Sequence, residues 1–217
     1  MKKITNKYYF STEGETEKWY LQHLEKLINN EAASVCNVSF YVKKSNPISY
    51  VKGINVLKKT PVYHVFDVES NQEDDIKSFE NMLGCMRKAE GLGRTIVYEN
   101  GYSNLTFELW LILHKIDCNC VNNKSNYLNL INKAFHLHCS GLTEYKEEKF
   151  FKDKVLSKIT LDDVKNAVKR ADEIMKQNKQ NKVLQFFKKY SWYKDNPATE
   201  LGNIIGKILK QCGLISN

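Results

Sequence analysis

The sequence predicts an α/β protein with a mostly parallel sheet and flanking helices, followed by a helical C-terminal extension. Strand-like and helix-like segments alternate over about the first 115 residues, which is typical of parallel strands joined by crossover helices. Some of these strands are apolar on both faces, as expected where helices cover both sides of a sheet. Beyond residue 115 we recognise only amphipathic helical patterns.

The elements of the first half follow in a regular order. An aromatic run at residues 7–11 predicts a strand, and apolar residues at helical spacing predict a helix from Thr12 to about Asn30. The segment Thr12-x-x-Glu15 has the pattern of a capping box at the start of this helix. Further strands are predicted at residues 34–44, 61–69 and 94–99, and further helices at 48–58, 71–90 and 103–115.

The second half is predicted to be helical. Amphipathic patterns cover residues 122–137, 161–179, 182–190 and 199–209. We therefore expect an α/β domain at residues 1–116 and a basic α-helical extension, packed on it, at residues 117–217.

Composition narrows the classes of function. Of the 217 residues, 42% are hydrophobic and 27% charged, values that are ordinary for a folded protein and exclude wholesale disorder. No run approaches 18 uncharged apolar residues, so we expect no membrane span and no membrane partner. Because no apolar signal-peptide core follows the N-terminus, we expect a cytoplasmic protein with six reduced cysteines.

The net charge of +8 is unevenly distributed. Residues 1–115 carry 15 basic and 14 acidic groups, whereas residues 116–217 carry 18 and 11. A basic half favours a polyanionic partner such as nucleic acid. Thirty lysines against three arginines are also what an AT-rich genome imposes on any protein surface, so charge alone leaves both interpretations open.

Acidic residues follow the predicted strands. Glu13 and Glu17 come after the first strand and can share one helix face, whereas Asp67 and Glu69 end the third and are expected to share one strand face. Ligands collect at the carboxyl ends of parallel strands, and carboxylate oxygens suit Mg²⁺. The pattern predicts a site for one or two hard cations and phosphoryl chemistry. The alternative for Glu13 and Glu17 is a pair of acids favoured at a helix start.

Glu108 lies in a segment that is apolar almost all round, Leu105–Leu113. Such a helix is buried, and an ionised Glu inside it needs a cation, either Lys, Arg or a metal. Ser103 is expected to be the N-cap of this helix.

Three motifs combine these residues. They are Glu13-Gly-Glu-Thr-Glu17 after a strand, Asp67-Val-Glu69 at the end of an apolar strand, and the block Ser-Asn-x-x-Phe-Glu-x-Trp-x-x-x-His from Ser103 to His114. Together they resemble the RloB family of Toprim-fold proteins. The segment Asn196-Pro-Ala-Thr199 looks like a further family feature, so that the resemblance spans nearly the whole chain.

The resemblance implies a small Rossmann-like Toprim sheet that binds Mg²⁺ or Mn²⁺ through a Glu and an Asp-x-Asp pair. The metal ligands that it implies in this sequence are Glu13, Glu17, Asp67, Glu69 and Glu108. The catalytic residues that it implies are these five together with Ser103 and His114, the latter without an assigned role. Two positions depart from the family pattern, because Glu69 stands in place of an Asp and Leu105 in place of a Pro.

The resemblance also implies an activity, that of a metal-dependent endonuclease in prokaryotic anti-phage defence. Its substrate would be RNA, such as tRNA, or DNA. Relatives work with an ABC-type or SMC-like ATPase encoded nearby, and this chain has no GxxxxGK[ST] phosphate loop of its own. The alternative is a non-catalytic Toprim-like subunit that binds a partner ATPase or RNA.

Residues 188–194 (KKYSWYK) form a second candidate region for nucleic acid. Lys188, Lys189, Trp192 and Lys194 provide the combination that stacks on single-stranded bases and binds phosphates. The alternative is a helix end that packs its aromatic rings on the core while the lysines extend to solvent.

A zinc site is a third possibility. Its candidate ligands are Cys118, Cys120, His136, His138 and Cys139, whose spacing matches no standard zinc finger. Reduced structural cysteines are the default interpretation, and zinc binding stays open.

Overall fold

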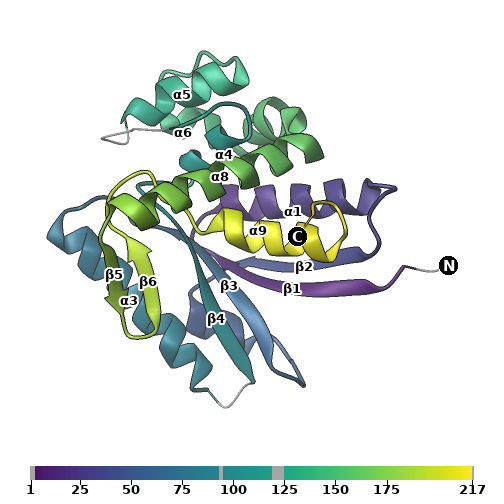
Figure 1. The fold of residues 1–217 in the computed structure, drawn as a ribbon, viewed down its shortest axis with the longest axis vertical. Coiled ribbons are helices and arrows are strands. Elements are labelled where there is room, and N and C mark those ends of the chain that lie inside the picture. The colour runs from purple at the N-terminus through teal and green to yellow at the C-terminus, as the bar shows by residue number, and fades with distance from the viewer. Residues whose placement is uncertain (1–2, 93–94, 119–124, 217) are drawn as a thin grey trace.

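The computed structural model describes residues 3–92, 95–118 and 125–216. At its centre lies a parallel four-stranded sheet in the order β2-β1-β3-β4 (Figure 1). Its strands are β1 (Thr5–Thr12), β2 (Asn37–Lys44), β3 (Thr60–Asp67) and β4 (Ile96–Ser103). The prediction of an α/β protein with a parallel sheet is confirmed. β4 is longer than predicted, because it continues through the polar residues 99–103.

Helices cover both faces of this sheet. On one face lie α1 (Glu15–Asn30) and α9 (Leu201–Gln211), and on the other lie α2 (Pro47–Lys52) and α3 (Glu73–Glu90) (Figure 1). Alternation along β3 divides the core accordingly, since Tyr63 and Val65 pack with α1 whereas Val62 and Phe66 pack with α3. α2 is shorter than predicted and ends at Gly53.

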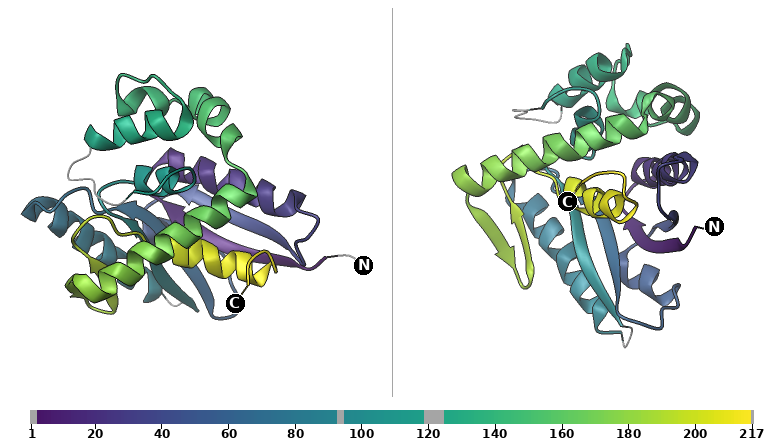
Figure 2. Two further views of the ribbon diagram at one scale, coloured as in Figure 1. Left: turned by 45° about the horizontal axis from the view of Figure 1, so that its top comes forward. Right: turned by 45° about the vertical axis from the view of Figure 1, so that its right-hand side comes forward.

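The middle of the chain forms a separate helical layer. Figure 2 shows that α4 and α8 lie between the sheet and the pair α5 and α6. The helices of this region are α4 (Glu108–Leu113), α5 (Ser125–Phe135), α6 (Leu142–Tyr145), α7 (Glu148–Phe150), a π-helical turn (Phe151–Val155), a 3₁₀ turn (Leu156–Lys158) and α8 (Leu161–Asn181). A capping box fixes the start of α8, because the Thr160 side chain accepts from the Asp163 N–H and the Asp163 carboxylate accepts from the Thr160 N–H.

Residues 182–190, predicted as a helix, belong instead to a β-hairpin of β5 (Leu184–Phe187) and β6 (Tyr190–Tyr193). The expectation of helices alone after residue 115 is therefore wrong. Aromatic residues favour strands, and Lys188 with Lys189 forms a two-residue turn in which Lys188 has a φ of 56°. The hairpin packs on α3 through Trp192, whose ring lies 5.2 Å from that of Phe79.

The C-terminal residues return to the sheet. Thr199 forms a bridge with Ser103 at the end of β4, and α9 packs against β4. Gly101 makes this approach possible, since a Cβ there would lie 3.1 Å from the His64 carbonyl oxygen and from Ile204. The hydrophobic core on the α1 side thus includes residues from both halves of the chain. None of the described helices is long and apolar enough to cross a membrane.

Candidate active site at the carboxyl edge of the sheet

The carboxyl ends of β1 and β3 form the centre of the candidate site. From β1 the chain moves to β2 on one side, whereas β3 and β4 lie on the other side, so that the strand order reverses between β1 and β3. Ligands of open α/β sheets bind at such a reversal. Glu13 follows β1, and its Oε2 accepts a hydrogen bond of 3.3 Å from the backbone N–H of Asp67, the last residue of β3.

Glu17 lies in the first turn of α1 and points into the protein. It is only 5% exposed, and the Thr16 hydroxyl donates to its Oε2 at 3.0 Å. Gly14 leaves room for this carboxylate, because a Cβ at Gly14 would lie 2.4 Å from Oε2 of Glu17. Burial raises the pKa of Glu17 to about 6, and the nearby Glu108 adds to the shift. Gly14 is the N-cap of α1, so the predicted capping box from Thr12 to Glu15 is wrong.

Glu108 is fully buried at the start of α4. Its Oε1 lies 2.7 Å from Nζ of Lys146, and the hydroxyls of Thr106 and Tyr145 donate to its carboxylate. Burial by itself would raise the pKa of Glu108, but the Lys146 charge and these hydrogen bonds outweigh it and lower the pKa. The prediction that a buried Glu108 needs a cation is confirmed, and Lys146 supplies that cation.

Asp67 lies close enough to the other three acids for their charges to affect its pKa. Burial raises its pKa well above the ordinary range, and the charges of Glu17, Glu108 and Glu13 raise it further. Glu13, Glu17, Asp67 and Glu108 therefore form one group, called here the carboxylate cluster. Lys146 follows α6 and lies near the whole cluster. Burial lowers its pKa, but the charges of Glu108, Asp67 and Glu17 outweigh that effect and raise it.

Ser103 lies beside Asp67 as its partner in the β3–β4 ladder. Its hydroxyl is 3.0 Å from that of Thr199, so the C-terminal segment reaches the edge of the site. The expectation that Ser103 caps a helix is wrong, because β4 continues to Ser103 and α4 begins only at Glu108, with Phe107 as its N-cap.

Comparison with known proteins agrees with these motifs. The family model described as RloB-like protein matches residues 8–208, which is most of the chain. The chain belongs to the RloB-like family. Neither the curated proteins nor the solved structures gave a match. The matched range includes the carboxylate cluster, Lys146 and Thr199.

Glu69 of this RloB-like protein lies beyond the end of the strand that was expected to include it. β3 ends at Asp67, and Glu69 has a left-handed φ of 67°, so the alternation of a strand does not extend to it. The reason for expecting Asp67 and Glu69 on one strand face therefore does not hold at Glu69, and its role as a metal ligand stays a prediction.

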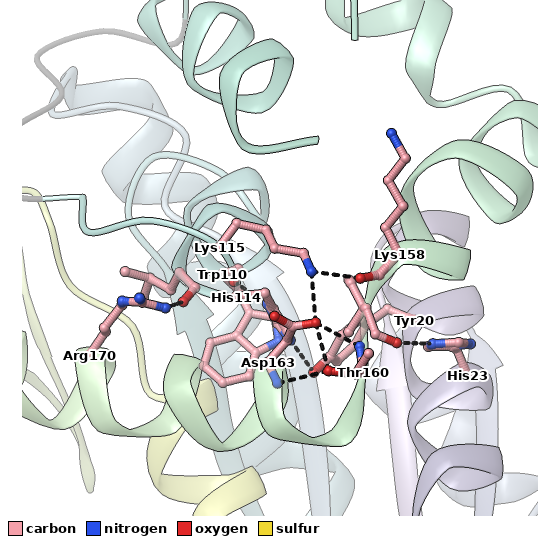
Figure 3. A network of polar contacts seen from close by, with 11 residues as sticks. Tyr20, His23, Trp110, His114, Lys115, Lys158, Thr160, Asp163 and Arg170 are labelled. Carbon is pink, nitrogen blue, oxygen red and sulfur yellow. Dashed lines mark hydrogen bonds and ion pairs between the residues drawn. The ribbon is translucent and has the colours of Figure 1, made fainter. Parts of the chain in front are cut away.

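His114 lies in a buried polar network between α1, α4 and α8 (Figure 3). Its Nε2 is 3.0 Å from the Tyr20 hydroxyl, and its Nδ1 is 2.8 Å from the Trp110 carbonyl oxygen. Burial lowers the pKa of His114 to about 4, and the charged groups that affect it are Asp163 and Lys115. Both ring nitrogens of His114 are thus within hydrogen-bonding distance of groups on α1 and α4.

The hairpin separates the residues of the basic-aromatic segment. Trp192 is 3% exposed against Phe79, which matches the alternative of aromatic rings packed on the core. Lys188, Lys189 and Lys194 are exposed at the surface, although Lys189 forms an ion pair with Glu90. Only the lysines of this segment are therefore accessible to a phosphate backbone.

The candidate zinc residues lie around the start and end of α5. Cys118 and Cys139 are buried, His136 and His138 are exposed after the end of that helix, and Cys120 lies outside the described residues. Within residues 3–92, 95–118 and 125–216, no three His, Cys, Asp or Glu side chains are arranged closely enough to hold a metal by themselves.

The donor chemistry of the carboxylate cluster nevertheless fits Mg²⁺. This ion keeps several waters and takes only one or two protein carboxylates, so it needs no complete cage of side chains. Burial is the main cause of the raised pKa values of Asp67 and Glu17, and the charges of neighbouring carboxylates add to it. A bound divalent cation would offset that added repulsion. One or two of Asp67, Glu17 and Glu13 could hold it, with water molecules as the remaining ligands.

Sequence reasoning named neither Lys146 nor Tyr145, and it gave no role to Gly14 and Thr199, which stand in the quoted motifs. Tyr145 and Lys146 lie in a charged stretch, residues 144–149, without a recognisable motif. A buried Glu108 requires a counter-ion, and this requirement was the only sequence signal for Lys146. It predicts a cationic partner but not the position of that partner in the chain.

Proposed function

We propose that this protein is a Toprim-type nuclease that hydrolyses phosphodiester bonds in RNA or DNA with Mg²⁺ or Mn²⁺. The main support is the convergence of four carboxylates from three strand ends at the point where the strand order reverses. Membership in the RloB-like family adds to this support. We include a role in prokaryotic anti-phage defence in the proposal.

In this proposal one or two of Asp67, Glu17 and Glu13 hold the metal ion together with water molecules. When bound, the ion lowers the pKa of a water molecule and stabilises charge on the phosphate oxygens. Glu108 is a positioning residue, because its ion pair of 2.7 Å holds Lys146 near the other carboxylates. Lys146 then contacts a non-bridging phosphate oxygen as a point charge, a common use of lysine in phosphate sites.

The charge distribution suits a nucleic-acid substrate. Residues 116–217 carry 18 basic and 11 acidic groups, whereas the sheet that carries the cluster is close to neutral. The basic part attracts the phosphate backbone and the metal ion screens the carboxylates from it. An ABC-type or SMC-like ATPase is the proposed partner, which purification of the protein together with the product of a neighbouring gene would test.

The first experiment is a cleavage assay with labelled tRNA, single-stranded DNA and duplex DNA, in Mg²⁺, in Mn²⁺ and in EDTA. We expect cleavage that EDTA abolishes and that Glu13→Gln and Asp67→Asn each reduce at least roughly a hundredfold. Asp74→Asn, an exposed acid in the first turn of α3, is the matched control and should retain activity. Cleavage that survives both cluster variants would refute the proposed site.

One observation favours a second function, that of a non-catalytic subunit that binds a partner ATPase or RNA. Lys146 already neutralises Glu108, so part of the cluster has a structural explanation without a metal ion. Toxicity on overproduction distinguishes the two functions in the presence of all cellular partners. A nuclease predicts that Asp67→Asn abolishes the toxicity, whereas a binding subunit predicts that this isosteric variant stays as toxic as the wild type.

A further inference from the structure

A pocket of about 320 Å³ opens next to the carboxylate cluster, on the α3 side of the sheet. Thr12 and Glu13 at the end of β1 and residues 44–46 at the end of β2 form its rim, together with His64 of β3 and Met82 of α3. Glu13 therefore belongs both to the cluster and to this pocket. A molecule in the pocket would lie directly beside the proposed metal site.

His64 is the unusual residue of the pocket. It is 1% exposed, and its Nδ1 lies 2.8 Å from the Ser11 hydroxyl and 3.2 Å from the Ser11 carbonyl oxygen. We assign the proton of the ring to Nδ1, because the Ser11 carbonyl oxygen only accepts hydrogen bonds; Nε2 then has a free lone pair. Among the described residues Nε2 has no hydrogen-bond partner. A buried acceptor without a partner is costly, so its presence beside a pocket indicates a ligand.

The chemistry of the pocket limits the kind of ligand. The ring of His64 is neutral, because burial lowers its pKa to about 3, so it offers an acceptor and no charge. Met82 provides an adaptable apolar wall. Lys44 is exposed at the rim, where it can contact a phosphate. An uncharged planar group that has an N–H donor and is joined to a phosphate satisfies all three conditions.

We propose that this pocket binds one nucleobase of the strand cleaved at the carboxylate cluster, with an N–H of the base donating to Nε2 of His64. This inference rests on the proposed nuclease function and adds a base-binding subsite to it. Every natural base carries an N–H on its Watson–Crick edge, and bases of single strands are free to turn into such pockets. The proposal requires that Met82, which lines the same pocket as His64, move aside to admit the base to the buried Nε2.

The test compares two single-stranded 12-mers, an unmodified oligonucleotide and one whose nucleotides are all abasic, by fluorescence anisotropy in Ca²⁺. Wild-type protein should bind the unmodified strand roughly tenfold more tightly, as one held base contributes about that factor. Met82→Trp fills the pocket and should bring this ratio near one while affinity for the abasic strand is unchanged. Asn81→Trp, at the exposed neighbouring position of α3, is the control and should keep the ratio.

His64→Phe, which keeps a ring but removes the acceptor, should also lower the ratio, with folding of each variant checked by circular dichroism. In wild-type protein labelled with ¹⁵N-histidine, the Nε2 resonance of His64 should move with the unmodified strand and not with the abasic one. If the ratio of the two affinities is unchanged in the folded variants, or if the Nε2 resonance does not move, the base pocket is overturned. If the protein still cleaves nucleic acid in that case, the nuclease proposal stands. Absence of both binding and cleavage overturns the nuclease proposal and the pocket together.

Discussion

Gly14 determines where the carboxylate of Glu17 can lie, because a Cβ at this position would come within 2.4 Å of Oε2. The φ of −113° and ψ of 171° at Gly14 are accessible to alanine, so Gly14→Ala should fold with little change in thermal stability. We expect it to displace Glu17 and to lower the cleavage rate roughly ten- to a hundredfold. Gly84→Ala, whose Cβ would meet Phe187 at an ordinary 3.9 Å, is the control, and equal rates for both variants would contradict the prediction.

Lys146 is the counter-ion of a fully buried acid, so its removal has a cost in stability. Lys146→Met should lower the free energy of unfolding by about 2 kcal/mol, which is less than for a completely buried pair because the lysine itself is partly exposed. The loss should shrink at acid pH, since protonation of Glu108 removes the unpaired charge. Chemical denaturation measures both effects, and Lys146→Met combined with Glu108→Gln should recover most of the stability.

At the scale of elements, the β5–β6 hairpin presents lysines rather than aromatic rings to solvent. Each phosphate contact of a lysine contributes about 0.7 to the slope of log K against log salt for single strands. Replacing Lys188, Lys189 and Lys194 with Gln should therefore flatten that slope by about 1 to 2, with a smaller share from Lys189 because Glu90 already pairs with it. The control is the same exchange in the exposed residues Lys52, Lys58 and Lys59, and an equal slope change in both triple variants would argue against the hairpin.

The elements also show what could be predicted from sequence and what could not. Strands of the parallel sheet were predictable because their apolar runs are distinct, as in residues 62–66. The hairpin was not, because Lys188 and Lys189 interrupt its aromatic residues at a spacing that fits a helix equally well. Glu13, Glu17, Asp67 and Glu108 were predictable as strand-end acids, whereas Lys146 depends on a long-range contact that no local pattern records.

For the whole molecule, binding of a divalent cation should couple to stability and pH. Burial raises the pKa of Glu17 to about 6 and raises the pKa of Asp67 well above its usual range. The stability that these groups give in their protonated forms is therefore lost as pH rises. Mg²⁺ competes with those protons. At ten times its Kd it should add about 1.4 kcal/mol, or about 3 to 5 °C in Tm, at pH 8, and much less at pH 5.5.

Thermal denaturation with and without Mg²⁺ at the two pH values measures this difference. Burial lowers the pKa values of His64 and His114, so the stability that these neutral rings give is lost as pH falls below the ordinary histidine pKa. This loss is the same with and without Mg²⁺, so it cancels in the difference between the two Tm values. Asp67→Asn should remove the Mg²⁺ effect. A rise in Tm of the same size at both pH values would show that the ion binds elsewhere.

The bridge between Thr199 and Ser103 has a consequence for how the protein is made. Ribosomes release a chain from its N-terminus, so the strands that carry Glu13 and Asp67 emerge before Lys146, and Thr199 and α9 emerge after it. A nascent chain therefore has its acids but neither their lysine counter-ion nor the segment that closes the edge of β4. In the proposed nuclease, the site would therefore be complete only after α9 has docked on β4.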